Sequence, residues 1–154
     1  MRLELGEVLV REYRDSDLDA ICALDEACFA VEFRFSRESM RRFVTRRGAI
    51  CLIAEAEGGE IAGFVIVHLE RGARGYVVTL DVGEGWRRRG LAGTLMEAAE
   101  ARVRAAGAGV MGLHVFTGNE GAVGFYEGRG YARVGVVRGF YGRVGDAYVY
   151  RKEL

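Results

Sequence analysis

The chain has 154 residues, half of them hydrophobic, which is enough for one compact core but not for two of ordinary size. Its 22 basic residues (lysine and arginine) balance its 22 acidic ones, so no overall charge attracts nucleic acid or an anionic membrane. Three cysteines, Cys22, Cys28 and Cys51, are an odd number without C-x-x-C spacing, which argues against a disulfide framework or a zinc site. We therefore expect a single domain over residues 1–154 with no bound metal.

The N-terminal residues 1–7 contain two glutamates where a signal peptide would have an apolar core. No window approaches the roughly 20 apolar residues of a membrane-spanning helix. These features predict a soluble, cytoplasmic protein without a membrane partner, and they leave both a monomer and a homodimer open.

Hydrophobic periodicity and turn residues divide the chain into strands and helices. In chain order these are a strand at 8–12, a helix from Asp15 or Ser16 (its cap) to about 28, a helix capped by Ser36 and ending near 47, strands at 50–55, at 61–69 and from 75, a helix at about 90–106, a strand at 110–116, a helix at about 119–127, and strands at 131–137 and 147–151. The order βααβββαβαββ indicates a mixed α/β (α+β) fold, with a mixed, mostly antiparallel central sheet flanked by helices. The strand 110–116 should return parallel beside the strand that begins at Gly75.

Two connections stand out between these elements. Gly58 and Gly59 supply the positive φ angles that a tight hairpin between strands 50–55 and 61–69 demands. Residues 29–35 (FAVEFRF) are unusually aromatic for a loop, so this segment either packs on the core or lines a groove.

A strand, a glycine-rich turn and a helix follow one another in residues 75–100 (GYVVTLDVGEGWRRRGLAGTLMEAAE). Such a turn leaves backbone N–H groups unpaired at the positive end of a helix dipole, which suits a phosphate or pyrophosphate. It lacks the G-K-[ST] of a Walker motif, and this disfavours a nucleoside triphosphate. A solvated run of charge is the alternative interpretation of the three consecutive arginines at 87–89.

In this setting the motifs resemble those of the GNAT superfamily of acetyl-CoA-dependent N-acetyltransferases. The family pattern Q/R-x-x-G-x-G/A follows the fourth strand, and residues 87–92 (RRRGLA) fit it. A second block is similar to the family pattern N-x-x-A-x-x-F-Y-x-x-x-G-F, through Asn119, Ala122, Phe125, Tyr126, Gly130 and Tyr131.

Within the family the chain looks most like protein N-terminal acetyltransferases, of the methionine type first and of the ribosomal-protein alanine type next. Residues 76–80 (YVVTL), 113–115 (LHV) and 138–149 (RGFYGRVGDAYV) carry this likeness. The resemblance implies an acyltransferase that moves an acetyl group from acetyl-CoA to the α-amine of a protein or peptide N-terminus by direct attack. A ribosomal protein is one candidate acceptor.

The resemblance also implies which residues bind coenzyme A. The backbone of Leu80 and Val82 would pair with the pantetheine arm, and the Val82 N–H would face the thioester carbonyl as an oxyanion donor. The other expected contacts come from the turn, the helix start and the following helix: Arg87, Arg88, Arg89, Gly90, Leu91, Ala92, Gly93, Thr94, Asn119 and Tyr126. Asn119 is also a plausible N-cap, and Tyr126 a plausible anchor for its helix.

Acetyl transfer needs a neutral amine, whereas an α-amine with a reference pKa of about 8 is partly protonated at neutral pH. His114 is the natural base because histidine titrates near that pH. Tyr76 and His114 match the pair that shares this role in methionine-type enzymes, while the ribosomal-protein enzymes have glutamate at the second position. Tyr126 would protonate or hydrogen-bond the leaving thiolate. The alternatives are a core histidine and a half-buried strand tyrosine.

The acceptor would lie between the loop 29–35 and a hairpin near residue 140, which the family closes over the peptide. Phe29 and Val31 would form an apolar pocket for the first side chain, and Tyr141 would hydrogen-bond the peptide backbone. Phe140 stands where relatives have the first of two tyrosines.

Three other functions remain open. A GNAT enzyme of the same chemistry can instead acetylate a small-molecule amine or a lysine. Arginine, glycine and aromatic residues interleave at 129–131 and 138–143, as in nucleic-acid-binding segments, although the zero net charge counts against that. A silent acyl-CoA sensor would keep the turn 87–92, but the presence of both Tyr76 and His114 argues against it.

Overall fold

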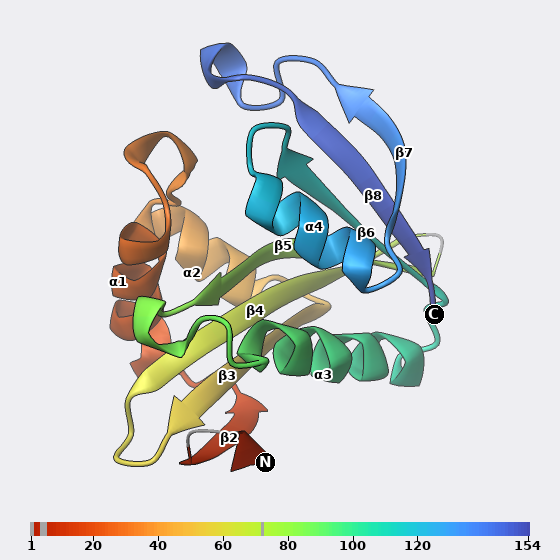
Figure 1. Ribbon diagram of the computed structural model, residues 1–154. Coiled ribbons are helices and arrows are strands. Elements are labelled where there is room, and N and C mark those ends of the chain that lie inside the picture. Colours follow the sequence, from red (N-terminus) through yellow and green to blue (C-terminus); the bar gives the residue numbers. More distant parts are fainter. Residues whose placement is uncertain (1, 4–5, 72) are drawn as a thin grey trace.

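The computed structural model describes residues 2–3, 6–71 and 73–154. They form one twisted sheet in the order β1-β2-β3-β4-β5-β6-β8-β7, with helices on both faces (Figure 1). The elements are β1 (Arg2–Leu3), β2 (Gly6–Glu12), α1 (Leu18–Cys28), α2 (Arg37–Thr45), β3 (Ala49–Ala56), β4 (Ile61–Glu70), β5 (Arg74–Val82), α3 (Leu91–Ala105), β6 (Val110–Phe116), α4 (Glu120–Gly128), β7 (Ala132–Val137) and β8 (Ala147–Glu153). Short 3₁₀ turns lie at Asp15–Asp17, Val31–Phe33, Glu84–Trp86 and Gly142–Val144.

The sheet is antiparallel except where β6 lies beside β5. β6 returns parallel to β5 after α3, as the element order predicts, and the expected mixed, mostly antiparallel sheet is confirmed. The parallel ladder joins only residues 74–76 to residues 110–112. Beyond it the two strands separate towards their carboxyl ends (Figure 1). Among the described strands, none pairs with this edge of β5 after Tyr76.

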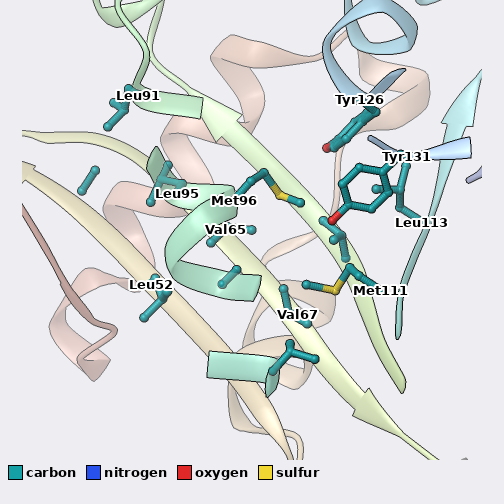
Figure 2. Close-up of a cluster of buried hydrophobic side chains, with 14 of the residues drawn as sticks. Leu52, Val65, Val67, Leu91, Leu95, Met96, Met111, Leu113, Tyr126 and Tyr131 are labelled. Atoms are coloured by element: carbon teal, nitrogen blue, oxygen red, sulfur yellow. The ribbon is translucent and has the colours of Figure 1, made fainter. Parts of the chain in front are cut away.

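Apolar side chains fill both faces of the sheet, and β4 is buried from 62 to 68 because helices cover it on both sides. The larger core lies under α3 and α4 and includes Val65, Leu95, Met96, Met111 and Tyr126 (Figure 2). The smaller core lies under α1 and α2 and includes Ile21, Met40, Ile53, Phe64 and Ile66. β5 is therefore held between two packed layers.

A bulge at Val78 interrupts the ladder between β4 and β5. Val78 packs on the α1 and α2 side, and strict alternation would place Leu80 there too. The extra residue instead turns Leu80 and Val82 to the α3 side, which leaves Thr79 and Asp81 facing α1. Nothing in the apolar pattern of the strand predicts that the side chains change faces after Val78.

The expectation that Asp15 or Ser16 caps the first helix is wrong. Both residues lie in a 3₁₀ turn, and Asp17 occupies the N-cap position of α1. The Asp17 carboxylate accepts the Arg14 N–H at 2.7 Å and two hydrogen bonds from the Arg11 guanidinium at 2.9 Å. These bonds hold the turn that precedes α1, whereas the Asp17 side chain makes no capping hydrogen bond to the helix itself.

Other local predictions agree with the structure. Gly58 and Gly59 have φ angles of 94° and 93°, as the hairpin requires. The Ser36 hydroxyl oxygen accepts the Ser39 N–H at 3.1 Å and caps α2. That helix ends at Thr45, two residues earlier than expected, because the next residue already has an extended ψ of 139°. In the part of the chain that the structure describes, no helix has the length and apolar character needed to cross a membrane.

Candidate active site

A cavity of about 220 Å³ opens where β5 and β6 separate. We call it the smaller cavity. Residues 77–80 of β5 form one wall and residues 113–116 of β6 form another, while Asn119, Ala122 and Tyr126 contribute from the start and body of α4. Three rings of the aromatic loop, Phe29, Phe33 and Phe35, line it as well. The loop therefore lines a groove, and Phe35 also packs against the smaller core, so both alternatives that its composition leaves open apply.

Tyr76 and His114 meet at the end of the parallel ladder, with the Tyr76 hydroxyl 2.8 Å from Nδ1 of His114. Burial lowers the pKa of His114 below its usual value, although the charge of Glu70 opposes the shift. Burial, assisted by Tyr141 and Glu70, raises the pKa of Tyr76 to about 12. At neutral pH the imidazole is thus uncharged and the phenol protonated, so His114 is able to accept a proton.

A second, larger cavity of about 660 Å³ adjoins the first and shares His114 and Tyr141 with it. Tyr76 and Phe140 also line this larger cavity. The Phe140 ring stacks on the imidazole of His114, with centroids 4.2 Å apart and an interplanar angle of 13°. The Tyr76–His114 pair consequently lies at the junction of two cavities, and His114 is a lining residue rather than a core residue.

The loop 29–35 and the β7–β8 connection touch through aromatic rings. The Phe33 centroid lies 5.1 Å from that of Phe116 and 5.1 Å from that of Tyr141. Phe29 lines the smaller cavity as expected, but Val31 lines neither cavity and its residue is 68% exposed. Val31 was expected in the pocket wall; the 3₁₀ turn Val31–Phe33 directs Phe33 inward instead. The aromatic composition of the loop signalled Phe33, whereas Phe116 looked like an ordinary strand residue.

Leu80 and Val82 present backbone groups to the open edge of β5. The Gly83 N–H donates to the Ala62 carbonyl at 2.8 Å, towards β4. Because peptide groups alternate along a strand, the N–H groups of Leu80 and Val82 point away from β4, to the side that β6 leaves open. The Val82 carbonyl accepts the Cys28 thiol at 3.3 Å.

The turn before α3 has the geometry of an anion-binding helix start. Gly90 has a φ of 83° and caps α3 without a side-chain hydrogen bond, and Arg88 has a φ of 63°. The N–H groups of residues 91–93 therefore lack a side-chain acceptor, and Arg88 and Arg89 are exposed beside them. Open amides and cationic side chains fit a pyrophosphate. Arg87 differs, because its Nε donates to the Val82 carbonyl at 3.1 Å and ties the turn to β5.

Tyr126 and Asn119 lie where α4 closes the smaller cavity. Tyr126 is only 8% exposed and packs beside Tyr131, with centroids 5.6 Å apart (Figure 2). Burial is the main reason that its pKa is raised well above the usual range, so its hydroxyl stays protonated and donates. The Asn119 side chain accepts the Ala122 N–H at 3.1 Å, which confirms that it is an N-cap. Both residues still line the cavity.

The comparisons with known proteins agree with this geometry. Residues 18–131 match the model of the Acetyltransferase (GNAT) family, and the chain belongs to this family. An N-alpha-acetyltransferase of Sulfurisphaera tokodaii is 26% identical over 157 residues, covering 93% of this chain and 91% of that protein. The family and the enzyme class expected from residues 87–92 are thereby confirmed.

Two solved structures illustrate the likeness in fold. The ribosomal-protein-S18-alanine N-acetyltransferase from Escherichia coli has a TM-score of 0.86 at 19% identity, covering 96% of this chain and 94% of that chain. Arabidopsis thaliana NAA60 in complex with acetyl-CoA has a TM-score of 0.83 at 21% identity, covering 96% of this chain and 99% of that one. The expected GNAT-like fold is confirmed.

Proposed function

We propose that the protein is an N-α-acetyltransferase that transfers the acetyl group of acetyl-CoA to the α-amine of a protein or peptide N-terminus. The observation that carries this proposal is the contact between Tyr76 and His114 at the junction of the two cavities. Membership of the family and the similarity to the Sulfurisphaera tokodaii N-alpha-acetyltransferase support the same conclusion.

Acetyl-CoA would bind along the open edge of β5. The outward N–H and C=O groups of Leu80 would pair with the pantetheine arm, and the Val82 N–H would polarise the thioester carbonyl. The amides of residues 91–93, assisted by Arg88 and Arg89, would hold the pyrophosphate. Arg87 would support this site by holding the turn against β5, since its Nε already has an acceptor.

His114 would act as the base, directly or through a water held by the Tyr76 hydroxyl. It takes a proton from the acceptor amine, which leaves a lone pair to form the C–N bond as the C–S bond breaks. Acetyl-CoA, when bound, supplies the electrophilic acyl carbon and the thiolate leaving group. The Tyr126 hydroxyl, which its raised pKa keeps protonated, would donate a hydrogen bond to the departing thiolate, and the thiolate leaves with coenzyme A. The aromatic walls around the site exclude water and so limit hydrolysis.

The acceptor would enter through the larger cavity, with its first side chain against Phe29, Phe33 and Phe116. Such apolar walls favour a long apolar first residue such as methionine over a charged one. Tyr141 would hydrogen-bond the peptide backbone. Phe140 has no hydroxyl and instead covers one face of the His114 ring. The aromatic residues of segment 138–143 are thus engaged inside the site, which disfavours the nucleic-acid alternative.

Incubation with acetyl-CoA and peptides that begin Met-Leu, Met-Lys, Ser or Ala, followed by mass spectrometry, tests the proposal. We expect one acetyl group on the α-amine, with the methionine peptides preferred. Acetylation of free polyamines or of internal lysines alone would favour the small-amine or lysine alternative. The absence of α-amine acetylation on every peptide would refute the proposal.

A further inference from the structure

Two buried carboxyl groups touch each other beneath the acceptor loop. Asp25, in the last turn of α1, is 0% exposed and Asp81, in β5, is 1% exposed. Their side chains are within hydrogen-bonding contact of each other. Among the described residues, Oδ1 of Asp25 and Oδ2 of Asp81 have no donor. The mechanism above uses neither carboxyl group.

The other oxygen of each carboxyl group reaches a different part of the site. Oδ2 of Asp25 accepts the Phe35 N–H at 2.9 Å, and the Asp25 carbonyl accepts the Phe29 N–H at 3.1 Å. One residue therefore bonds both ends of the loop 29–35. Oδ1 of Asp81 accepts the Thr79 hydroxyl at 2.5 Å, and Thr79 lines the smaller cavity.

Two ionised carboxylates in contact and away from water are very unfavourable, so the pair must retain one proton. Burial, followed by the contact with Asp25, raises the pKa of Asp81 well above its usual range. With the proton on Oδ2 of Asp81 and donated to Oδ1 of Asp25, all four carboxyl oxygens have partners.

We propose that Asp25 and Asp81 are positioning residues: a proton-sharing pair that fixes the acceptor loop 29–35 against the donor strand β5. The identity of the acceptor in this statement rests on the proposed function. Neither carboxyl group touches the reacting atoms; Asp25 acts through the loop and Asp81 through β5. The pair holds Phe29 and Phe35 in the wall of the smaller cavity, and so it sets acceptor affinity more than the rate of transfer.

Four other titratable groups interact electrostatically with the pair. Cys22 and Cys28 come from α1, Arg87 from the turn before α3 and Tyr126 from α4. Burial raises the pKa of the Cys28 thiol and of the Tyr126 hydroxyl, so both are neutral at neutral pH. β4 pairs with this part of β5 and contributes only apolar residues there. Because the pKa of Asp81 is raised, the bridge keeps its proton to a higher pH than an ordinary aspartate would, and it is lost as the pH rises through that pKa.

Two substitutions at one position separate a shared proton from simple packing. In Asp81→Asn the side-chain amide donates to Oδ1 of Asp25 without needing a proton, so the acceptor KM should stay within about threefold of wild type. In Asp81→Ala the Asp25 carboxylate loses its donor, and the acceptor KM should rise about tenfold or more with a smaller change in kcat. Equal impairment of the two variants, or no rise in acceptor KM in Asp81→Ala, would overturn the proposal.

Hydrogen exchange of the Phe35 amide gives a readout that needs neither an acceptor nor the alanine variant. In the wild-type protein, protection of this amide should fall as the pH is raised through the elevated pKa of Asp81, after correction for the intrinsic rate. In Asp81→Asn it should stay constant, and the Met40 amide in α2, bonded to the Ser36 carbonyl, provides the control. The same pH dependence in both proteins would contradict the shared proton. Because no peptide is involved, this result stands even if no peptide is acetylated.

Discussion

The donor and acceptor sides that we propose for this site are built from different parts of the polypeptide. The donor side consists mainly of backbone groups, at the open edge of β5 and in the first turn of α3. The acceptor side consists of side chains from the loop 29–35 and the β7–β8 connection, whose rings meet at Phe33 and Tyr141. Recognition by backbone groups depends on the path of the chain, and so it suits one kind of ligand. Loop side chains, in contrast, can be substituted without altering the path of the chain. The fold thus constrains the donor much more tightly than the acceptor.

Removing the His114 imidazole, which lies where the two sides meet, should have the largest effect on catalysis. We expect His114→Ala to lower kcat by about 100-fold at neutral pH, because general-base catalysis typically contributes that much or more. The KM for acetyl-CoA should change little. The deficit should shrink as the pH approaches and passes about 8, where the α-amine loses its proton without help. Steady-state kinetics from about pH 6 to about pH 9 measure both effects.

One result for His114→Ala would contradict this role. A loss of acetyl-CoA affinity as large as the loss of kcat, with no dependence on pH, would identify His114 as a structural residue. Tyr76→Phe provides the matched comparison, since it removes only the hydroxyl that lies 2.8 Å from Nδ1.

A change in the turn should affect the donor side alone. A Cβ at Gly90 meets nothing within 4 Å, but its φ of 83° is strained for alanine by about 1 kcal/mol. Gly90→Ala should therefore raise the KM for acetyl-CoA about fivefold and leave the acceptor KM unchanged. Gly85→Ala is the control, because its Cβ also meets nothing within 4 Å and no positive φ is present. Equal effects of the two substitutions would mean that the conformation of Gly90 does not matter for acetyl-CoA binding.

A change in the loop should affect the acceptor side alone. Phe33→Ala removes ring contacts with Phe116 and Tyr141, so the KM of a methionine-initiated peptide should rise about fivefold. Val31→Ala, two residues away on the same turn, should stay within about twofold because that residue lies outside both cavities. A larger effect for Val31→Ala than for Phe33→Ala would favour the pocket of Phe29 and Val31 that the sequence predicts.

The smallest expected effect is a shift in the acid side of the pH profile. Catalysis requires neutral His114, and burial keeps its pKa below the usual value, so wild-type kcat/KM should persist below about pH 6.5 and fall as the imidazole is protonated. Phe140→Ala uncovers one face of the ring and should move the pKa back up. The acid side of the profile then shifts to higher pH. An unchanged or lower midpoint would mean that Phe140 does not shield His114.

The sequence carries more information about the proposed donor side because the requirements of that side are local. The turn between β5 and α3 needs a glycine in the left-handed region, and this requirement produces a recognisable motif at residues 87–92. His114 was a candidate base on its own chemistry, but Tyr76 and its pairing with His114 were found only through resemblance, because their contact depends on β6 returning beside β5. The bulge at Val78 and the buried pair Asp25 and Asp81 depend on tertiary packing, and no spacing in the sequence signals them. Val31 lies outside both cavities, and an apolar loop residue cannot be assigned a direction without the turn that holds it.

The most direct test of acetyl transfer to a peptide N-terminus compares two versions of one methionine-initiated peptide that contains an internal lysine. In the first the α-amine is free, and in the second it is blocked while the lysine stays available. With acetyl-CoA as donor, we predict a single acetyl group on the α-amine of the first peptide and none on the second. Equal acetylation of the two peptides at lysine, or no acetylation of the first, would contradict transfer to a peptide N-terminus.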